Sequence, residues 1–509
     1  GEERAVAVYR YTNGTFADIS RSLGLDTFMW QQNAGGSMSF GDYNNDGLLD
    51  FTITTIGEYA SVDMNDSSFR ISEADPIFIS AYKQVCDDAG IHAILDPALS
   101  QFNPDTRAVL DAFLKKPEKC LLANRSLVQF ALQSASSTDR ASLSGSFVLI
   151  VPGSAHMFEN THAGFVEKKQ FSEYLHSVWQ RDSSGFTRDN QLNTETLTGR
   201  YFQPVSFDFN GDGRLDMFIS VDFGRSMLLE NEGDWTFKDV TKDHGMDISG
   251  TGMGVHVADL SNVGRPDILV TNVLDDFLYR SVATGTYKAE ISGISRSGIG
   301  WGNSFLDYNL DGWQDVYIAN GDFTFFGTLP LLPLSTSFFR ADRLYENVRG
   351  TLVDRTWHDF CPDAQSGKTA AVSDYDNDGD PDVFVGNINL NRDDPAVHSM
   401  GIPSGYAGNV LYENTTRSAD QKQAHYLEIR LEGTVSNRMG IGATVQVTAG
   451  GTTQTQFRVL GSGYFAQDSG TLDFGLAGNT SAEVRVKWPS GRTSTVHDVQ
   501  ADQRITVIE

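Results

Sequence analysis

The stretch FGDYNNDGLLDFTI, residues 40–53, decides how the rest of this chain is interpreted. Oxygen-bearing side chains alternate along it and surround a glycine; these residues are Asp42, Asn44, Asp46, Gly47 and Asp50. The pattern is compatible with an EF-hand, with a solvated turn or with one unit of a repeat. Repetition has to be tested first, because a repeat architecture changes the meaning of every single motif.

Four further copies of the stretch occur, beginning at Phe207, Val257, Phe305 and Val372. They read FDFNGDGRLDMFI, VADLSNVGRPDILV, FLDYNLDGWQDVYI and VSDYDNDGDPDVFV. The first aspartates of three successive copies, Asp208, Asp259 and Asp307, are 51 and 48 residues apart. Such a period is typical of repeat proteins, including propellers with one blade per repeat.

The loop pattern D-x-[DN]-x-D-G-x-x-D suits a hard cation such as Ca²⁺. Side chains at positions 1, 3 and 5 would point inward, the glycine at position 6 allows a sharp turn, and the aspartate at position 9 closes the shell. Four loops carry a complete set, so we expect about four Ca²⁺ ions. The predicted ligands are Asp42, Asn44, Asp46, Asp50, Asp208, Asn210, Asp212, Asp216, Asp307, Asn309, Asp311, Asp315, Asp374, Asp376, Asp378 and Asp382.

There are two alternatives to a calcium-binding repeat, and the sequence argues against only one of them. An EF-hand needs a bidentate Glu at position 12 and a helix on each side, whereas that position is β-branched in all five copies and the segment leaving the loop is typical of a strand. An Asx-rich turn without an ion stays open as the alternative. The third loop, which begins at Asp259, has Ser261 and Val263 where oxygen ligands are needed, so we expect its site to be weak or empty.

A second repeat follows the acidic loops. It reads LLENEGDWTFKDV from Leu228, LYRSVATGTYKAE from Leu278, LYENVRGTLVDRT from Leu344 and LYENTT from Leu411. Each full copy is typical of a β-hairpin, so one unit comprises four antiparallel strands, the content of a propeller blade. The last copy lacks its final strand. We therefore predict that residues 15–19 complete it and close an all-β propeller of about six or seven blades.

The C-terminal part alternates apolar and polar residues, which predicts a small β-sandwich or barrel over residues 424–509. Its segments HYLEIRLEGTVSNRMGIGATVQV, DFGLAG and VRVKWPSGRTSTV resemble the ASPIC/UnbV domain. The matching residues are Asn437, Arg438, Gly440, Gly442, Ala443, Phe474, Gly475, Trp488, Pro489, Ser490 and Gly491.

The acidic loops and hairpins resemble FG-GAP/VCBS repeats, as in integrin α-subunit propellers. Together with the tail they are similar to the cartilage acidic protein family and its bacterial relatives. The resemblance implies a calcium-binding propeller that is secreted, either extracellular or periplasmic. It supplies no catalytic residue.

Charge restricts the partners of the protein. The chain has 66 acidic and 39 basic residues and a net charge of −27. This balance disfavours nucleic acid and anionic membranes as partners, because both need a basic footprint. No apolar run approaches the roughly 18 residues of a membrane helix, so we expect no transmembrane segment. We also expect the protein to be a monomer.

Residues 57–200 do not follow the repeat. Helix-start signals at Asp75–Pro76 and Asn103–Pro104 lead us to assign residues 57–132 to a helical insertion within a blade. The strands predicted from Gly145 and His156 are interpreted as one or two further blades without cation loops. The propeller is thus assigned to residues 1–56 and 133–420.

The insertion and two other long connections join the second strand of a blade to the third. In an up-and-down blade these connections leave the face opposite the acidic loops. We therefore expect residues 57–145, 322–340 and 386–410 to carry the ligand-binding function. The candidate polar groups are Arg340, Asp393, Asp394 and His398.

Two functions are compatible with this arrangement. In the first, a secreted calcium-binding propeller binds a protein, glycan or small-molecule ligand at the face with the inserted loops. In the second, the insertion covers a pocket and the protein is a biosynthetic enzyme of secondary metabolism. A helical lid that excludes water favours the enzyme. The absence of a recognisable nucleophile–base motif favours the binding protein, which is the function we predict.

Overall fold

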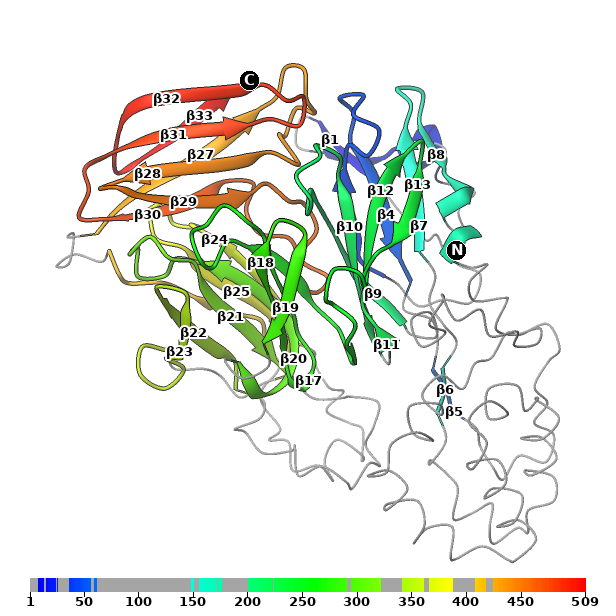
Figure 1. Ribbon diagram of the computed structural model, residues 1–509, viewed down its shortest axis with the longest axis horizontal. Coiled ribbons are helices and arrows are strands. Elements are labelled where there is room, and N and C mark those ends of the chain that lie inside the picture. Colours follow the sequence, from blue (N-terminus) through cyan, green and yellow to red (C-terminus); the bar gives the residue numbers. More distant parts are fainter. Residues whose placement is uncertain are drawn as a thin grey trace, which may run out of the picture.

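In the computed structural model the chain is described over a set of ranges separated by gaps. These are residues 8–12, 15–23, 25, 36–55, 59–61, 148–150, 155–171, 173–175, 200–222, 224–290, 294–321, 341–360, 366–387, 408–417 and 424–509. They form an all-β protein of small, mostly antiparallel sheets with a separate C-terminal domain (Figure 1). No helix within these ranges is long and apolar enough to cross a membrane.

Five sheets repeat one up-and-down strand order, and we call them blades one to five. Blade one comprises β3 (Met38–Gly41), β4 (Asp50–Thr54), β7 (Ala155–Asn160) and β8 (Phe165–Glu167), and blade two comprises β9 (Arg200–Phe207), β10 (Asp216–Asp222), β12 (Met227–Gly233) and β13 (Thr236–Asp239). Blade three comprises β15 (Val255–Ala258), β16 (Asp267–Val270), β18 (Phe277–Ala283) and β19 (Thr286–Glu290). Blade four comprises β20 (Ser295–Leu306), β21 (Asp315–Asn320), β22 (Arg343–Val348) and β23 (Thr351–Asp354), and blade five comprises β24 (Gly367–Ser373), β25 (Asp382–Asn387) and β26 (Val410–Tyr412).

The blades follow one another as in a propeller. Their first strands, β3, β9, β15, β20 and β24, lie next to one another in chain order. Neighbouring blades also share hydrophobic cores; Tyr43 of blade one, for example, packs edge-on against Phe237 of blade two with ring centroids 6.2 Å apart. Burial on both faces explains why second strands such as β10 and β21 are apolar runs instead of alternating ones.

Short strands accompany these sheets. β17 (Val273–Asp275) adds to blade four beside β20. Two further pairs stand apart, β5 (Tyr59–Ser61) with β6 (Val148–Ile150), and β11 (Gly224–Arg225) with β14 (Ser249–Gly250). Residues 59–61 are therefore a strand, although they fall inside the insertion that we expected to be helical. The helices predicted within residues 57–132 lie outside the described residues.

Two expectations about blade composition need correction. The strands predicted from His156 are not a further blade, because β7 and β8 are the third and fourth strands of blade one. The N-terminal strand β2 (Thr15–Asp18) pairs with β1 (Tyr9–Thr12), and β26 pairs with β25 alone among the described strands. The N-terminal hairpin lies beside blade one, where Val8 packs against a core cluster, so the predicted closure of the last blade by residues 15–19 is not what these strands form.

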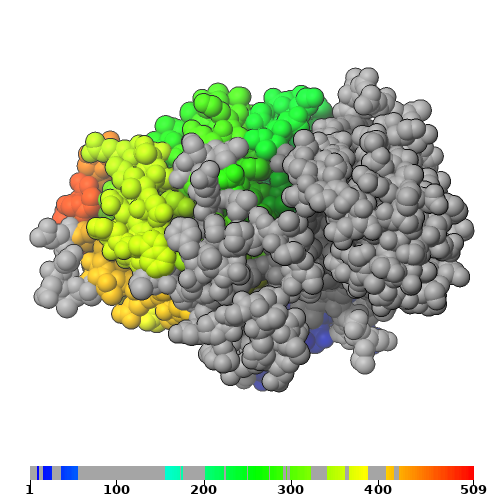
Figure 2. Space-filling model, turned by 90° about the horizontal axis from the view of Figure 1, so that it is seen from below, coloured from blue at the N-terminus to red at the C-terminus, as the bar shows by residue number. Residues whose placement is uncertain are grey.

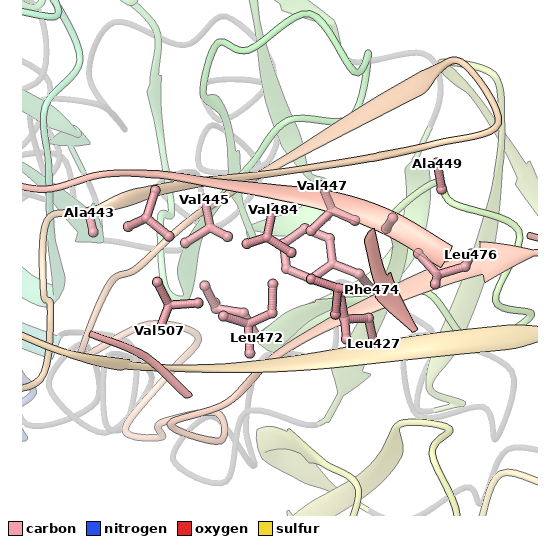
Figure 3. Packing of buried hydrophobic residues seen from close by; sticks show 14 of the residues in the cluster. Leu427, Ala443, Val445, Val447, Ala449, Leu472, Phe474, Leu476, Val484 and Val507 are labelled. Carbon is pink, nitrogen blue, oxygen red and sulfur yellow. The ribbon is translucent and has the colours of Figure 1, made fainter. Parts of the chain in front are cut away.

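The tail domain, residues 424–509, is a sandwich of two sheets. One contains β30 (Leu472–Ala477), β27 (His425–Glu432) and β33 (Gln503–Ile508); the other contains β29 (Thr452–Phe457), β28 (Thr444–Ala449), β31 (Ser481–Lys487) and β32 (Thr493–Gln500). Figure 3 shows their apolar side chains meeting between the sheets, with Leu427 and Phe474 facing Val447 and Val484. The fully buried Trp488 belongs to the same core.

A loop of the tail domain enters the centre of the five blades. Residues 460–469, which we call the axial loop, contact the first strand of every blade. Three contacts are hydrogen bonds: the Phe40 N–H donates to Leu460 O (2.9 Å), Val255 and Gly463 exchange backbone hydrogen bonds, and the Val372 N–H donates to Asp468 (2.8 Å). In the two other blades the rings of Phe202 and Trp301 lie against the ring of Tyr464. The centre is therefore filled by the chain itself.

Candidate metal-binding loops

The five acidic loops share one backbone conformation, which the repeated sequence explains. In each loop, positions 4 and 6 adopt a left-handed conformation; for loop one these are Asn45 (φ 57°) and Gly47 (φ 88°). Asn and Gly adopt this region most readily. Loop four places Leu310 there (φ 58°), although a bulky residue rarely adopts it. Leu310 is buried, and its carbonyl accepts a hydrogen bond from Ala477 of the tail domain at 2.9 Å.

The first aspartate of every loop ties the turn together. Its carboxylate accepts the backbone N–H groups of positions 5 and 6, as Asp42 does from Asp46 and Gly47, both at 2.9 Å. The corresponding acceptors in the other loops are Asp208, Asp259, Asp307 and Asp374. The carboxylate of the first aspartate therefore lies inside the turn in every loop.

The aspartate at position 9 joins the loop to the hairpin of its own blade. In loop four, Asp315 accepts the backbone N–H of Tyr308 in the loop (3.1 Å) and of Asn347 in β22 (2.7 Å). Asp50, Asp216, Asp267 and Asp382 make the same pair of bonds. Loop and hairpin, which the sequence presents as two separate repeats, are thus one structural unit.

The donor spacing of loop five fits a single cation. Carboxylate oxygens of Asp374, Asp376 and Asp382 all lie within 4.8 Å of one another. Two oxygens that each bind one ion at about 2.4 Å can be at most about 4.8 Å apart, so one Ca²⁺ could bind all three. The three other complete loops, at Asp42, Asp208 and Asp307, have the same backbone conformation and carry asparagine at position 3 where loop five has Asp376. Their carboxylate, amide and carbonyl oxygens are the ligands that Ca²⁺ prefers.

Burial makes the negative charge of these loops costly. It raises the pKa of Asp42 to about 6, of Asp50 to about 7 and of Asp216 to about 8, and neighbouring carboxylates add to the rise. The pKa of Asp307 is raised by its burial and by Asp311. A bound divalent cation would neutralise these groups where a proton otherwise has to.

The hairpins contribute acidic residues that the sequence analysis did not assign to the sites. Asn44 at position 3 donates to Glu159 (3.2 Å), Asn210 to Glu230 (3.1 Å) and Asn309 to Glu346 (3.5 Å). The glutamate precedes an asparagine in each hairpin. This Glu-Asn pair also occurs in MFEN, residues 157–160, and would have identified the hairpin of blade one.

The asparagine of the pair links neighbouring blades. The side-chain amide of Asn231 in blade two donates to the Tyr43 carbonyl in loop one and to Leu215 O in its own loop, both at 3.0 Å. Asn414 in blade five likewise reaches the Tyr308 carbonyl in loop four at 2.8 Å. Each acidic loop of this kind is therefore fixed by its own blade and by the next one.

The tail domain lies against the ends of the blades that carry the acidic loops (Figure 1). It reaches all five loops. The pairs are Val435 with Gly47, Gly442 with Leu215, Gln446 with Gly264, Gly475 with Asp307, and Arg504 with Asn377. At Gly475 a Cβ would lie 2.1 Å from Asp307 Oδ2, so only glycine fits there.

The long connections attach at the other end of the blades. The described residues next to them are Thr55 and Ala155, Gly321 and Ala341, and Asn387 and Gly408. All lie at or just after the end of a second strand, or at or just before the start of a third strand. In the view from below, blades three to five fill much of the described face and the tail domain appears only at its edge (Figure 2). The candidates Arg340, Asp393, Asp394 and His398 lie outside the described residues.

One serine–aspartate–histidine cluster occurs where the axial loop meets the blades. Ser304 Oγ donates to Asp468 Oδ1 at 3.0 Å, and His256 Nε2 lies 2.7 Å from Asp468 Oδ2. The aspartate stands between the other two, so the hydroxyl bonds to a carboxylate instead of an imidazole base. His256 and Asp468 line a cavity of about 70 Å³ between the domains. The bonds to Asp468 tie the axial loop to the blades.

These features define a class: an all-β repeat protein with propeller-like blades, an acidic loop in each blade and a C-terminal sandwich domain. Comparison with known protein families supports this class. The FG-GAP-like repeat matches residues 208–270, and the family described as ASPIC and UnbV matches residues 433–509. The chain thus combines FG-GAP-like repeats with a C-terminal ASPIC and UnbV domain.

Individual proteins are more distant. Cartilage acidic protein 1 of Xenopus tropicalis is 23% identical over 293 residues, which are 55% of this chain and 40% of that protein. The chain therefore matches less than half the length of this relative. Among solved structures, the V. cholerae biofilm matrix protein Bap1 is similar with a TM-score of 0.25 and 12% identity, over 60% of this chain and 61% of that one. An Agrocybe aegerita structure, described as recognising non-reducing terminal N-acetylglucosamine, has a TM-score of 0.25 and 13% identity, over 64% of this chain and 80% of that one.

Proposed function

We propose that the protein is a secreted, calcium-stabilised propeller that binds a protein, glycan or small-molecule ligand on the face opposite its tail domain. The observation that carries this proposal is the contact of the tail domain with all five acidic loops. That contact leaves the opposite ends of the blades, where the long connections attach, as the face for a ligand.

Calcium has a structural role in this proposal. The four complete loops lie where a blade meets the tail domain, and loops one and four also bond to the next blade, so an ion bound there would hold these parts of the chain together. Calcium sites of extracellular modules have Kd values of about 10⁻⁴–10⁻³ M, which the calcium outside cells can fill. An extracellular or periplasmic location therefore suits the loops and agrees with the relative in Xenopus, a cartilage protein by name.

Replacement of residues 322–340 by a short Gly/Ser linker between Gly321 and Ala341 tests the proposal. A ligand is first found by applying the calcium-loaded protein to a glycan array and to an array of extracellular proteins. The variant should lose binding of that ligand and keep the calcium content of the wild type. Binding that survives the replacement, but is lost when the surface of the tail domain is changed, would contradict the proposed face.

A further inference from the structure

Blade three differs from the other blades at one position of its hairpin, outside the acidic loop. Where the hairpins of blades one, two, four and five have a glutamate, blade three has Arg280. The residues at this position are Glu159, Glu230, Arg280, Glu346 and Glu413. The change places a positive charge beside the one loop that lacks ligands at positions 3 and 5.

The guanidinium of Arg280 reaches into that loop. Its Nη1 lies 3.3 Å from Oδ2 of Asp267, the aspartate at position 9. Both side chains are buried, with 11% and 3% of their surface exposed. A buried carboxylate needs a compensating charge, and Arg280 supplies it from the protein itself.

The other contacts of Arg280 fix it in this place. Nη2 donates to the Gly350 carbonyl in the hairpin turn of blade four at 2.8 Å, and Nε lies 3.4 Å from Glu290. Arg280 therefore links blade three to the next blade. It adds to the bond from the Asn347 amide of blade four to Leu260 O at the same junction. Blade three itself has no asparagine with which to reach blade two, since Ser281 stands at that position and its hydroxyl bonds to Ala283 O within its own hairpin.

Charge balance agrees with this role. In blade three the two loop aspartates, Asp259 and Asp267, are matched by Arg265 and Arg280. In blade four the loop holds three aspartates, Asp307, Asp311 and Asp315, and the hairpin holds Glu346, which pairs with Arg355 from outside the loop. The acidic and basic residues at these positions of blade three are therefore equal in number, whereas the loop of blade four keeps three carboxylates.

We propose that the guanidinium of Arg280 is a built-in replacement for the metal ion in blade three, so that this blade is stable without metal and excludes it. The exclusion of Ca²⁺ rests on the proposed calcium function, but the metal-independent stabilisation does not. The two parts are tested separately.

The first test measures stability in chelator. Arg280→Gln should lower Tm by at least about 3 °C in EGTA and by a similar amount in calcium, because its partner Asp267 loses its counter-charge in both. Glu230→Gln, at the same position of blade two, is the matched control and should not lower Tm in EGTA. An Arg280→Gln variant as stable as the wild type in EGTA would overturn the proposal. The comparison of Tm values in EGTA can be interpreted even if the wild type binds no calcium.

The second test measures calcium per chain by elemental analysis after gel filtration. The variant S261N/V263D/R280E restores the ligand residues and the hairpin glutamate, and it should bind one more ion than the wild type. The variant S261N/V263D keeps Arg280 and should bind no additional ion. A gain of one ion by the variant that keeps Arg280, or no gain by a folded triple variant, would overturn the exclusion.

Discussion

The side-chain amide of Asn347 in blade four donates a hydrogen bond to the carbonyl oxygen of Leu260, in the acidic loop of blade three, at 2.8 Å. Asn347 is fully buried, and the same amide also donates to Gln314 O at 2.9 Å. One side chain thus fixes two loops that are far apart in the sequence. The Glu-Asn pair of the hairpins is therefore a connection between blades as well as part of a strand.

Asn347→Ala should destabilise the protein by about 1–3 kcal/mol, because two buried carbonyl groups lose their donor. Urea denaturation at fixed calcium measures the change. Ser281→Ala, at the equivalent position of blade three, is the control; its hydroxyl bonds only within its own hairpin, so its cost should be smaller. Equal costs for the two variants would contradict the link between blades.

Calcium content should depend on position 5 of a complete loop. The wild type should bind about four ions per chain, and Asp311→Ala in loop four should bind one fewer, because it loses a carboxylate ligand. Val263→Ala changes the same position of the third loop and should leave the content unchanged. A wild type with almost no calcium after gel filtration in calcium buffer would show that the loops are ordinary turns.

Removal of calcium should lower Tm. An ion present at about 100 times its Kd stabilises the folded state by about 2.7 kcal/mol per site, provided that it does not bind the unfolded chain. The loss in EGTA should be reversed by calcium and not by magnesium, which prefers a tighter octahedral shell. Melting curves in EGTA, EGTA with excess calcium and EGTA with excess magnesium make the comparison, after prolonged incubation so that slow exchange is not mistaken for absence.

Tyr464→Ala in the axial loop should destabilise the protein by about 3–5 kcal/mol, since it removes a buried ring from the centre of the blades. The ring centroid of Tyr464 lies 5.3 Å from that of Phe202 and 5.2 Å from that of Trp301. Phe465→Ala is the control, because the Phe465 side chain is 40% exposed, and it should cost less. Denaturation midpoints that fall equally would argue against a central role for Tyr464.

Acid should weaken one contact of the tail domain in a defined range. Burial would raise the pKa of Glu509, but hydrogen bonds from Ser490 Oγ and from the N–H groups of Val435 and Ser436 outweigh it and lower the pKa to about 2. The stabilisation from this group is complete above the ordinary pKa of 4.5 and is lost as the pH falls toward 2. Glu509→Gln should therefore lower Tm at pH 7, and the difference from the wild type should shrink below pH 4.5. Glu432→Gln, an exposed control on the neighbouring strand β27, should show no such convergence.

The sequence predicted the parts of the fold that are local. The turn at Asp42–Asp50 depends on glycine, asparagine and alternating oxygen side chains within nine residues, and the hairpins depend on adjacent strands. Their register against the next blade was not predictable, since the Asn231 link to Tyr43 O joins residues 188 positions apart. The N-terminal hairpin was assigned to the wrong neighbour for the same reason. Its sequence identifies a hairpin and does not identify the blade beside which it packs.

The role of the axial loop could not be predicted from the sequence either. Residues 460–469 have neither a repeat nor a ligand pattern, and their importance comes from where the tail domain places them. Arg280, by contrast, was readable as a departure from a repeated Glu-Asn pair. The role of Arg280 could be inferred only from its short distance to Asp267, which is known only from the folded blade.

The position of the axial loop sets an order for biosynthesis. The blades emerge from the ribosome first, but the residues that fill their centre lie near the end of the sequence and emerge after all five. Until then the first strands of the blades expose the apolar side chains that later surround Tyr464, such as Phe202 and Ile299. A nascent chain is therefore an incomplete structure with an exposed interior, and a ribosome that stops before residue 460 would release a product prone to aggregation. The blades can therefore reach their final packing only after the axial loop has been synthesised.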